Sequence, residues 1–209
     1  MESPDSPTLA IANAAYGASE SLAAYERDEL PAVRRATSEN VRLLQSTGEQ
    51  RGQLQWYKQV VGQLSYDLAG RTEFLDGDFA AAEQSESRAA ADRKAAGIGD
   101  SGDYRRYNEI LTWLAMSQAR QGHAQQAAQT IAPVIQYDRD LVARNHGDRW
   151  LPEELAVALY VQALTDSGKR TALLREALTM IDGVAAEIRA THDIRQWRAR
   201  ILEAQRDRS

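Results

Sequence analysis

Three histidines, His123, His146 and His192, are the side chains best suited to metal or acid–base chemistry in this chain. No two of them lie three or four residues apart, so no helix would present two imidazoles to one metal ion. His146 and Asp148 could share a site, but a histidine satisfied within its own loop is the commoner arrangement. Cysteine is absent, which removes cysteine-ligated metals and disulfide bonds. We therefore expect no catalytic residue, no metal and no cofactor.

The segment GIGDSG, residues 97–102, spells the G-x-G-x-x-G of a dinucleotide-binding turn. That turn must follow a strand, whereas the residues before it, ESRAAADRKAA, favour a helix. The same letters contain the GDSG found around the nucleophile of trypsin-like proteases, but no histidine and aspartate pattern accompanies it. The segment is better read as a loop between helices, and we do not expect an enzyme.

The composition predicts a helical protein. The chain has 209 residues, of which only two are Phe and five are Pro. No segment alternates β-branched and polar residues over any length, so we expect an all-α fold without a β-sheet. The net charge of -5 argues against a nucleic-acid partner, because phosphate binding needs a concentrated positive field. No apolar run approaches the roughly 20 residues of a membrane span, so we expect no membrane insertion.

The stretch LTWLAMSQARQGHAQQAAQTIAPVI, residues 111–135, shows how the helices should be organised. Gly122 can take a positive φ and end one helix, and Ala127 allows the next helix to cross it closely. The same spacing recurs, about 45 residues apart, at Gly77 with Ala82 and at Gly168 with Leu173. A period of this length is typical of stacked helical hairpins.

The resulting organisation is one disordered segment, one domain and a capping helix. Residues 1–7 are predicted to be disordered, and residues 8–209 to form a single helical-repeat domain. Its predicted parts are hairpins at 8–47, 50–97, 103–144 and 151–190, followed by a capping helix at 192–206. Pro31 and Pro152 suit the first turns of two of these helices, and Pro133 predicts a kink or break inside another.

The repeat resembles the tetratricopeptide repeat. The family places small and apolar residues around the turn glycine, and the best-matching positions here are Leu114, Ala115, Gly122, Ala127, Ile131 and Val134. Glu86 departs from the pattern, and the repeat is longer than the family's roughly 34 residues, so helices or linkers must be longer. The resemblance implies an α-solenoid of stacked antiparallel hairpins.

In the resembled family, one stripe on the first helix of each hairpin lines a concave groove. Trp113, Met116 and Arg120 form such a stripe, because their spacing places them on one helix face. The equivalent positions of the flanking hairpins include Arg71, Phe74 and Gln162. Aromatic, methionine and arginine side chains suit a bound peptide or helix. The alternative is that neighbouring helices cover the stripe. For Trp150 and Trp197, packing is favoured over binding.

The function that these features favour is a non-catalytic scaffold that binds a protein or peptide, which fits a module of a larger bacterial signalling or regulatory assembly. The alternative is a ligand-gated sensor domain that encloses a small molecule or short peptide. We expect the cytoplasm, with a soluble periplasmic domain of a longer protein as the alternative. The sequence leaves the oligomeric state open.

Overall fold

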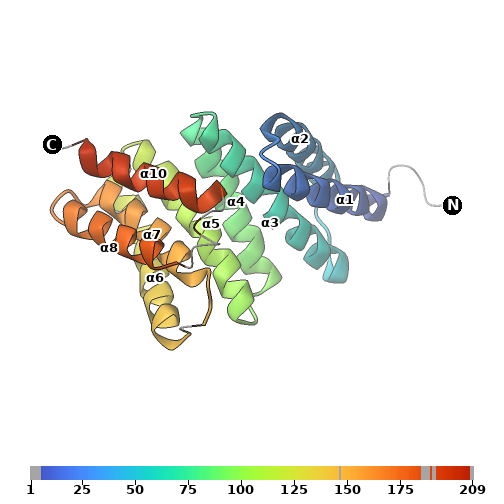
Figure 1. Ribbon diagram of the computed structural model, residues 1–209. Coiled ribbons are helices and arrows are strands. Elements are labelled where there is room, and N and C mark those ends of the chain that lie inside the picture. The colour runs from blue at the N-terminus through green and yellow to red at the C-terminus, as the bar shows by residue number, and fades with distance from the viewer. Residues whose placement is uncertain (1–5, 146, 185–188, 190–191, 208–209) are drawn as a thin grey trace. The chain divides into compact units, whose positions relative to one another are not determined.

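The computed structural model describes residues 6–145, 147–184, 189 and 192–207, and these residues form only α-helices and the turns that join them (Figure 1). The all-α prediction is therefore confirmed for the described part of the chain. The helices are α1 (Pro7–Glu26), α2 (Leu30–Ser46), α3 (Gly52–Leu75), α4 (Phe79–Ala96), α5 (Ser101–Arg120), α6 (Ala124–Arg144), α7 (Leu151–Thr165), α8 (Arg170–Gly183) and α10 (His192–Arg206).

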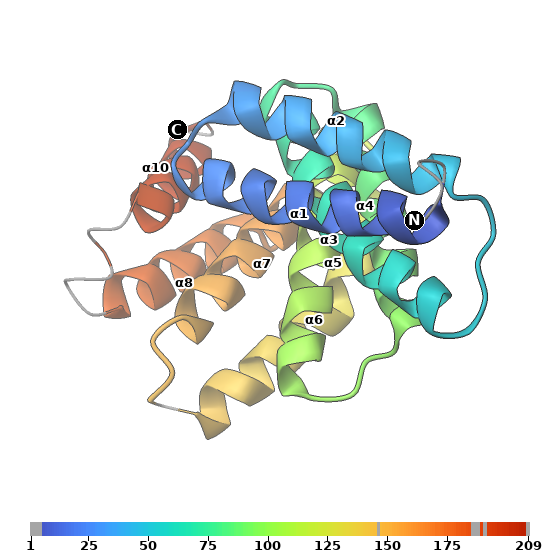
Figure 2. The same cartoon turned by 90° about the vertical axis from the view of Figure 1, so that its right-hand side faces the viewer.

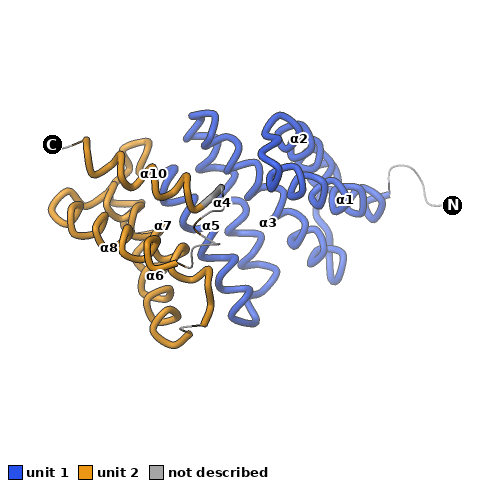
Figure 3. Tube along the Cα trace, in the orientation of Figure 1, with its two compact units in different colours: residues 1–117 blue, residues 118–209 orange. Residues whose placement is uncertain are grey.

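The chain folds as two compact units, residues 1–117 and residues 118–209, where the sequence predicted one domain over 8–209 (Figure 3). Unit 1 contains the first four helices and most of α5, and unit 2 contains the rest. Residues 1–5 of the predicted disordered segment lie outside the described residues, and Pro7 already begins α1.

Prolines and turn glycines mark several of the helix ends. Pro31 and Pro152 lie in the first turns of their helices, as predicted. Gly77 and Gly122 both have φ of 84°, the left-handed conformation that ends a helix at low cost for glycine. In the first hairpin, which lacks a glycine at the turn, Asp28 takes this role with φ of 60°.

The turn at Gly168 is built differently from the prediction. Gly168 is not among the described residues with positive φ, and α7 already ends at Thr165. Instead, the Lys169 backbone N–H donates to the Asp166 carboxylate over 3.0 Å, which closes the turn through a side chain. The break that was the alternative to a kink at Pro133 does not occur, because α6 continues through this residue from Ala124 to Arg144.

In unit 1, the paired helices α1 with α2 and α3 with α4 pack through small residues (Figure 2). The buried alanines at these contacts are at most 2% exposed and include Ala14, Ala18, Ala82 and Ala89. Three glycines inside the helices each face a polar side chain of the partner helix: Gly17 faces Asn40, Gly62 faces Asp92 and Gly70 faces Glu86. A β-carbon on Gly70 would lie 2.6 Å from a Glu86 carboxyl oxygen, so this crossing has no room for a side chain.

In unit 2, α7 is buried on most of its surface because it packs against both α6 and α8. The last helix, α10, packs on α8 and α7 through a single apolar stripe. Ile194 and Ile201 are fully buried, and Trp197 is 8% exposed with its ring 6.1 Å from that of Tyr160. A helix is therefore present at the predicted residues 192–206, and its apolar stripe is buried; a capping role for it stays a prediction.

A single small residue tests the predicted register of the third hairpin, residues 103–144. Ala127 is fully buried, whereas Ala124, one turn earlier on α6, is exposed. Ala127→Leu should therefore overpack the interior and lower the free energy of unfolding by about 1–3 kcal/mol. Ala124→Leu should change it by less than about 0.5 kcal/mol. Urea denaturation of both variants measures this difference, and equal midpoints would contradict it.

Candidate functional site

The predicted groove stripe lies mainly in the interior. Trp113 is 7% exposed and Met116 is 2% exposed, so the aromatic and methionine side chains do not form an open surface. Phe74 is half-buried, with its ring 5.5 Å from the Trp113 ring, and Arg71 is buried. The open-groove interpretation is therefore wrong for Trp113 and Met116, because neighbouring side chains cover them.

The other two candidate positions lie in unit 2. Arg120 is exposed at the end of α5, and Gln162 is half-buried on α7. A partner-binding role for any of the six candidate residues stays a prediction. The burial of Trp113 favours the alternative, a packing role.

Arg71 joins three helices of unit 1. It donates to both oxygens of Asp67, one turn earlier on α3, over 2.8 Å each. It also pairs with Glu109 of α5 over 2.8 Å. Its guanidinium carbon lies 5.7 Å from the Tyr25 ring of α1 and 5.6 Å from the Trp113 ring. One charged side chain thus contacts residues of α1, α3 and α5.

A fully buried carboxyl group lies beside this network. Glu86 of α4 is 0% exposed, and neither of its side-chain oxygens has a hydrogen-bond partner among the described residues. Its side chain crosses α3 over Gly70, one residue before Arg71. Burial, and then the nearby charge of Asp67, raise the pKa of Glu86 well above its ordinary value of 4.5.

The pKa values of the other two acids of the network, Asp67 and Glu109, shift in opposite directions because their surroundings differ. Burial raises the pKa of Asp67, and the Arg71 guanidinium works against that shift. For Glu109, desolvation is outweighed by Arg71 and Arg106, whose charges lower the pKa of its carboxyl to about 2. The network therefore combines two arginine-paired acids, Asp67 and Glu109, with one buried carboxyl group, Glu86, that has no hydrogen-bond partner among the described residues and whose surroundings favour the protonated form. Such groups mark functional or structurally strained positions.

Two exposed aromatic side chains meet near the start of α3. Trp56 and Tyr57 are 46% and 47% exposed. Their rings meet edge to face with centroids 5.0 Å apart, and the Trp56 indole N–H donates to the Ala96 carbonyl at the end of α4 over 3.0 Å. We call Trp56 and Tyr57 the aromatic surface.

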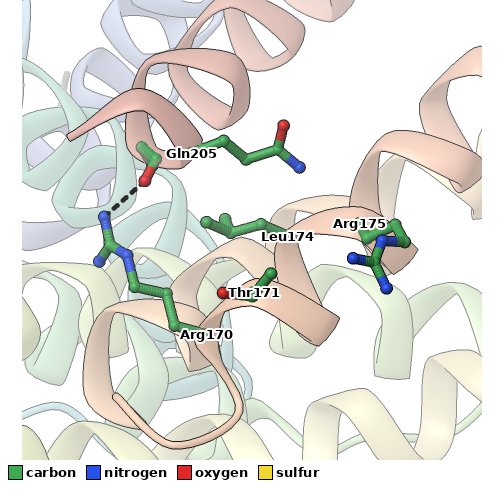
Figure 4. Close-up of a pocket in the computed structure, with 6 residues that line it drawn as sticks. Arg170, Thr171, Leu174, Arg175 and Gln205 are labelled. Carbon is green, nitrogen blue, oxygen red and sulfur yellow. Dashed lines mark hydrogen bonds between the residues drawn. The ribbon is translucent and has the colours of Figure 1, made fainter. Parts of the chain in front are cut away.

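Unit 2 has a pocket between α8 and α10 with a volume of about 280 Å³ (Figure 4). Its lining residues are Arg170, Thr171, Leu174 and Arg175 of α8 with Ala204 and Gln205 of α10. The Arg170 guanidinium donates to the Ala204 carbonyl over 2.8 Å. The pocket is therefore polar at its edges and apolar at Leu174.

The candidate metal-ligating side chains are scattered along the described residues. In the part of the chain that the structure describes, no three His, Asp or Glu side chains are placed to hold a metal ion. His123 is exposed at the start of α6, whereas His146 and the side chain of His192 lie outside the description. No described helix is long and apolar enough to cross a membrane.

Comparison of the chain with protein-family models, with curated proteins and with solved structures finds no match.

Sequence reasoning missed two of these features. Glu86 departed from the repeat pattern, and that departure was the one signal that it carries a special role. The exposed pair Trp56 and Tyr57 lies near the first turn of its helix, where periodicity gives little information on exposure. Trp150, for which packing was favoured, is in fact 47% exposed at the start of α7.

Proposed function

We propose that this chain is a non-catalytic helical-hairpin protein of the tetratricopeptide kind that binds another protein or a peptide. The support for the hairpin architecture is the agreement of helix boundaries, turn glycines and buried alanines with the repeat pattern. The support for binding is the aromatic surface. On this proposal, the partner contacts Trp56 and Tyr57 rather than the stripe around Trp113.

The exposure of Trp56 and Tyr57 is the observation that carries the proposal. Large aromatic side chains dominate binding energy at protein interfaces. The exposed part of an aromatic ring adds no burial energy to the stability of the free protein. Here two neighbouring aromatic residues each leave nearly half of their surface exposed, at 46% and 47%. Their contact with each other makes one continuous apolar patch.

The Trp56 ring is held in place before any partner arrives. Its single donor is already bonded to the Ala96 carbonyl, so it needs no polar partner from the ligand. A side chain that is ordered in the free protein loses less conformational entropy on binding. Trp56 therefore fits the part of an anchor that a partner covers with apolar groups.

The proposal predicts a selective loss of binding when Trp56 is removed. Trp56→Ala should weaken the complex by about 2 kcal/mol, or roughly thirtyfold in Kd, because central aromatic anchors carry such energies. Its effect on folding should stay near 1 kcal/mol, since the ring is half exposed and only one hydrogen bond is lost.

The measurement uses three baits: the unchanged chain, Trp56→Ala and Tyr16→Ala. Tyr16 is 67% exposed on α1 and serves as the matched control for removing an exposed aromatic ring. Proteins that the unchanged chain and Tyr16→Ala retain, and Trp56→Ala loses, are then purified and titrated directly. Equal Kd values for all three baits would contradict the proposal that the partner binds at the aromatic surface.

The sensor alternative requires a ligand site within the fold. The pocket between α8 and α10 is the described feature that fits it.

A further inference from the structure

The pocket between α8 and α10 is lined by groups that favour a negatively charged ligand. Its polar side chains are two guanidiniums, one hydroxyl and one amide, and no carboxylate is among its lining residues. Its volume of about 280 Å³ lies close to the lower end of the range for small-molecule sites, which starts near 300 Å³. The cavity suits a small ligand with acidic groups.

The two arginines of the pocket have no carboxylate partner among the described residues. This is notable in a chain with 30 acidic and 25 basic residues. Three other cations of unit 2 have a carboxylate partner: Arg139 pairs with Glu176, Lys169 with Asp166 and Arg198 with Asp182. The charges of Arg170 and Arg175 are therefore available to a ligand.

Arg170 is fixed in position. Its bond to the Ala204 carbonyl, 2.8 Å long, holds the guanidinium against α10. Its Nε is buried and has no hydrogen-bond partner among the described residues. The guanidinium is thus held at the wall of the pocket, where its charge can attract a ligand carboxylate.

The arrangement of the two arginines in the pocket favours a ligand with two acidic ends. Figure 4 shows Arg170 and Arg175 on opposite sides of Leu174, with Gln205 on the facing helix. Leu174 and Ala204 are the apolar residues of the lining. A compact ion contacts one guanidinium, whereas a molecule with acidic groups at both ends of a short hydrocarbon can contact both.

We propose that this pocket binds an organic dianion, with one carboxylate at Arg170, the other near Arg175 and the hydrocarbon between them over Leu174. The carboxylates can belong to a free dicarboxylic acid or to a peptide that ends in an acidic residue. This site is in unit 2 and is independent of the aromatic surface in unit 1.

Isothermal titration of the full chain with a series of linear dicarboxylates, from malonate to pimelate, tests the proposal. Binding should be saturable and strongest at one chain length, and butyrate should bind at least tenfold more weakly than the best diacid. Arg175→Gln should weaken the best diacid at least tenfold, with an unchanged unfolding midpoint, because Arg175 is exposed. Arg195→Gln, an exposed arginine of α10 outside the pocket lining, is the control and should leave the Kd unchanged.

Two further arms distinguish the sources of the carboxylates. A peptide ending in glutamate that binds more tightly than every free diacid, and loses affinity with Arg175→Gln, would identify a peptide end as the ligand. Inorganic phosphate that binds as tightly as the best diacid would overturn the two-ended ligand. The absence of saturable binding by every probe, or equal Kd values for Arg175→Gln and Arg195→Gln, would overturn the site itself.

Discussion

Replacing Arg71 by methionine should lower the free energy of unfolding by about 3–5 kcal/mol. Arg71 is 7% exposed and pairs with Asp67, which is 1% exposed. Burial opposes the charge of Arg71, but the carboxylates of Asp67 and Glu109 raise its pKa well above the ordinary value. Methionine fills much of the same space but leaves the Asp67 carboxylate buried without a cation, and that unpaired group is the main cost.

A second variant separates the charge effect from lost packing. Asp67→Leu combined with Arg71→Met removes both buried charges, so it should recover most of the stability lost with Arg71→Met alone. Glu109 keeps Arg106 as a partner in that variant, since the two are paired over 2.8 Å. Arg42→Met, which removes an exposed pair with Glu39, should leave the unfolding midpoint nearly unchanged.

Chemical denaturation of these variants at neutral pH gives the required free energies. A loss below about 1 kcal/mol for Arg71→Met, or a double variant as unstable as the single one, would show that the network does not hold unit 1 together.

Replacing Glu86 by glutamine should raise stability and flatten its dependence on pH. The raised pKa of Glu86, which burial causes first and the charge of Asp67 increases, means that the folded protein holds this proton more tightly than the unfolded chain does. Above pH 4.5, the ordinary value for this group, the unfolded chain loses the proton first, so stability falls as the pH rises through the raised pKa. Below pH 4.5 the neutral Glu86 carboxyl group makes its full contribution to the free energy of unfolding.

The fall attributable to Glu86 is limited to about 1.4 kcal/mol per pH unit, and glutamine, which is neutral at every pH, should remove it. Denaturation of the unchanged chain and Glu86→Gln from about pH 4.5 to 9 therefore should give curves that separate with increasing pH. Other acids contribute equally to both curves, so their difference reports Glu86. Glu83→Gln is the control, at a half-buried position one turn earlier on α4. In this variant the free energy of unfolding should still fall with rising pH as it does in the unchanged chain. Parallel curves for Glu86→Gln and the unchanged chain would contradict this assignment.

Much of the fold could be predicted from the sequence because turns and close helix crossings depend on local residue types. Gly77 and Gly122 marked turns since a positive φ is costly for other residues. The same rule failed at Gly168, which does not have a positive φ, because the Asp166 side chain closes that turn instead. Asp28 shows that an aspartate can also adopt the left-handed conformation, which glycine counting misses.

The candidate site was harder to predict, since helical spacing tells which residues share a face but not what covers that face. The spacing of Trp113 and Met116 identified one stripe correctly, yet both residues are buried. Trp150 and Trp56 lie near helix starts, where the periodic pattern is short, and both are about half exposed. The ion pair between buried Arg71 and partly exposed Glu109 joins residues distant in the sequence, which no local pattern indicates.

The glycines that face polar side chains have a consequence for how this chain can evolve. At the crossing of Gly70 with Glu86, a larger residue in place of the glycine collides with the carboxyl group, and a smaller residue in place of the glutamate leaves a void. Either change alone is harmful, whereas both together can preserve the volume between the helices. The same reasoning applies to Gly62 with Asp92 and to Gly17 with Asn40. Divergent relatives of this protein should therefore show correlated substitutions at these three pairs of positions, while the faces that point to solvent vary independently.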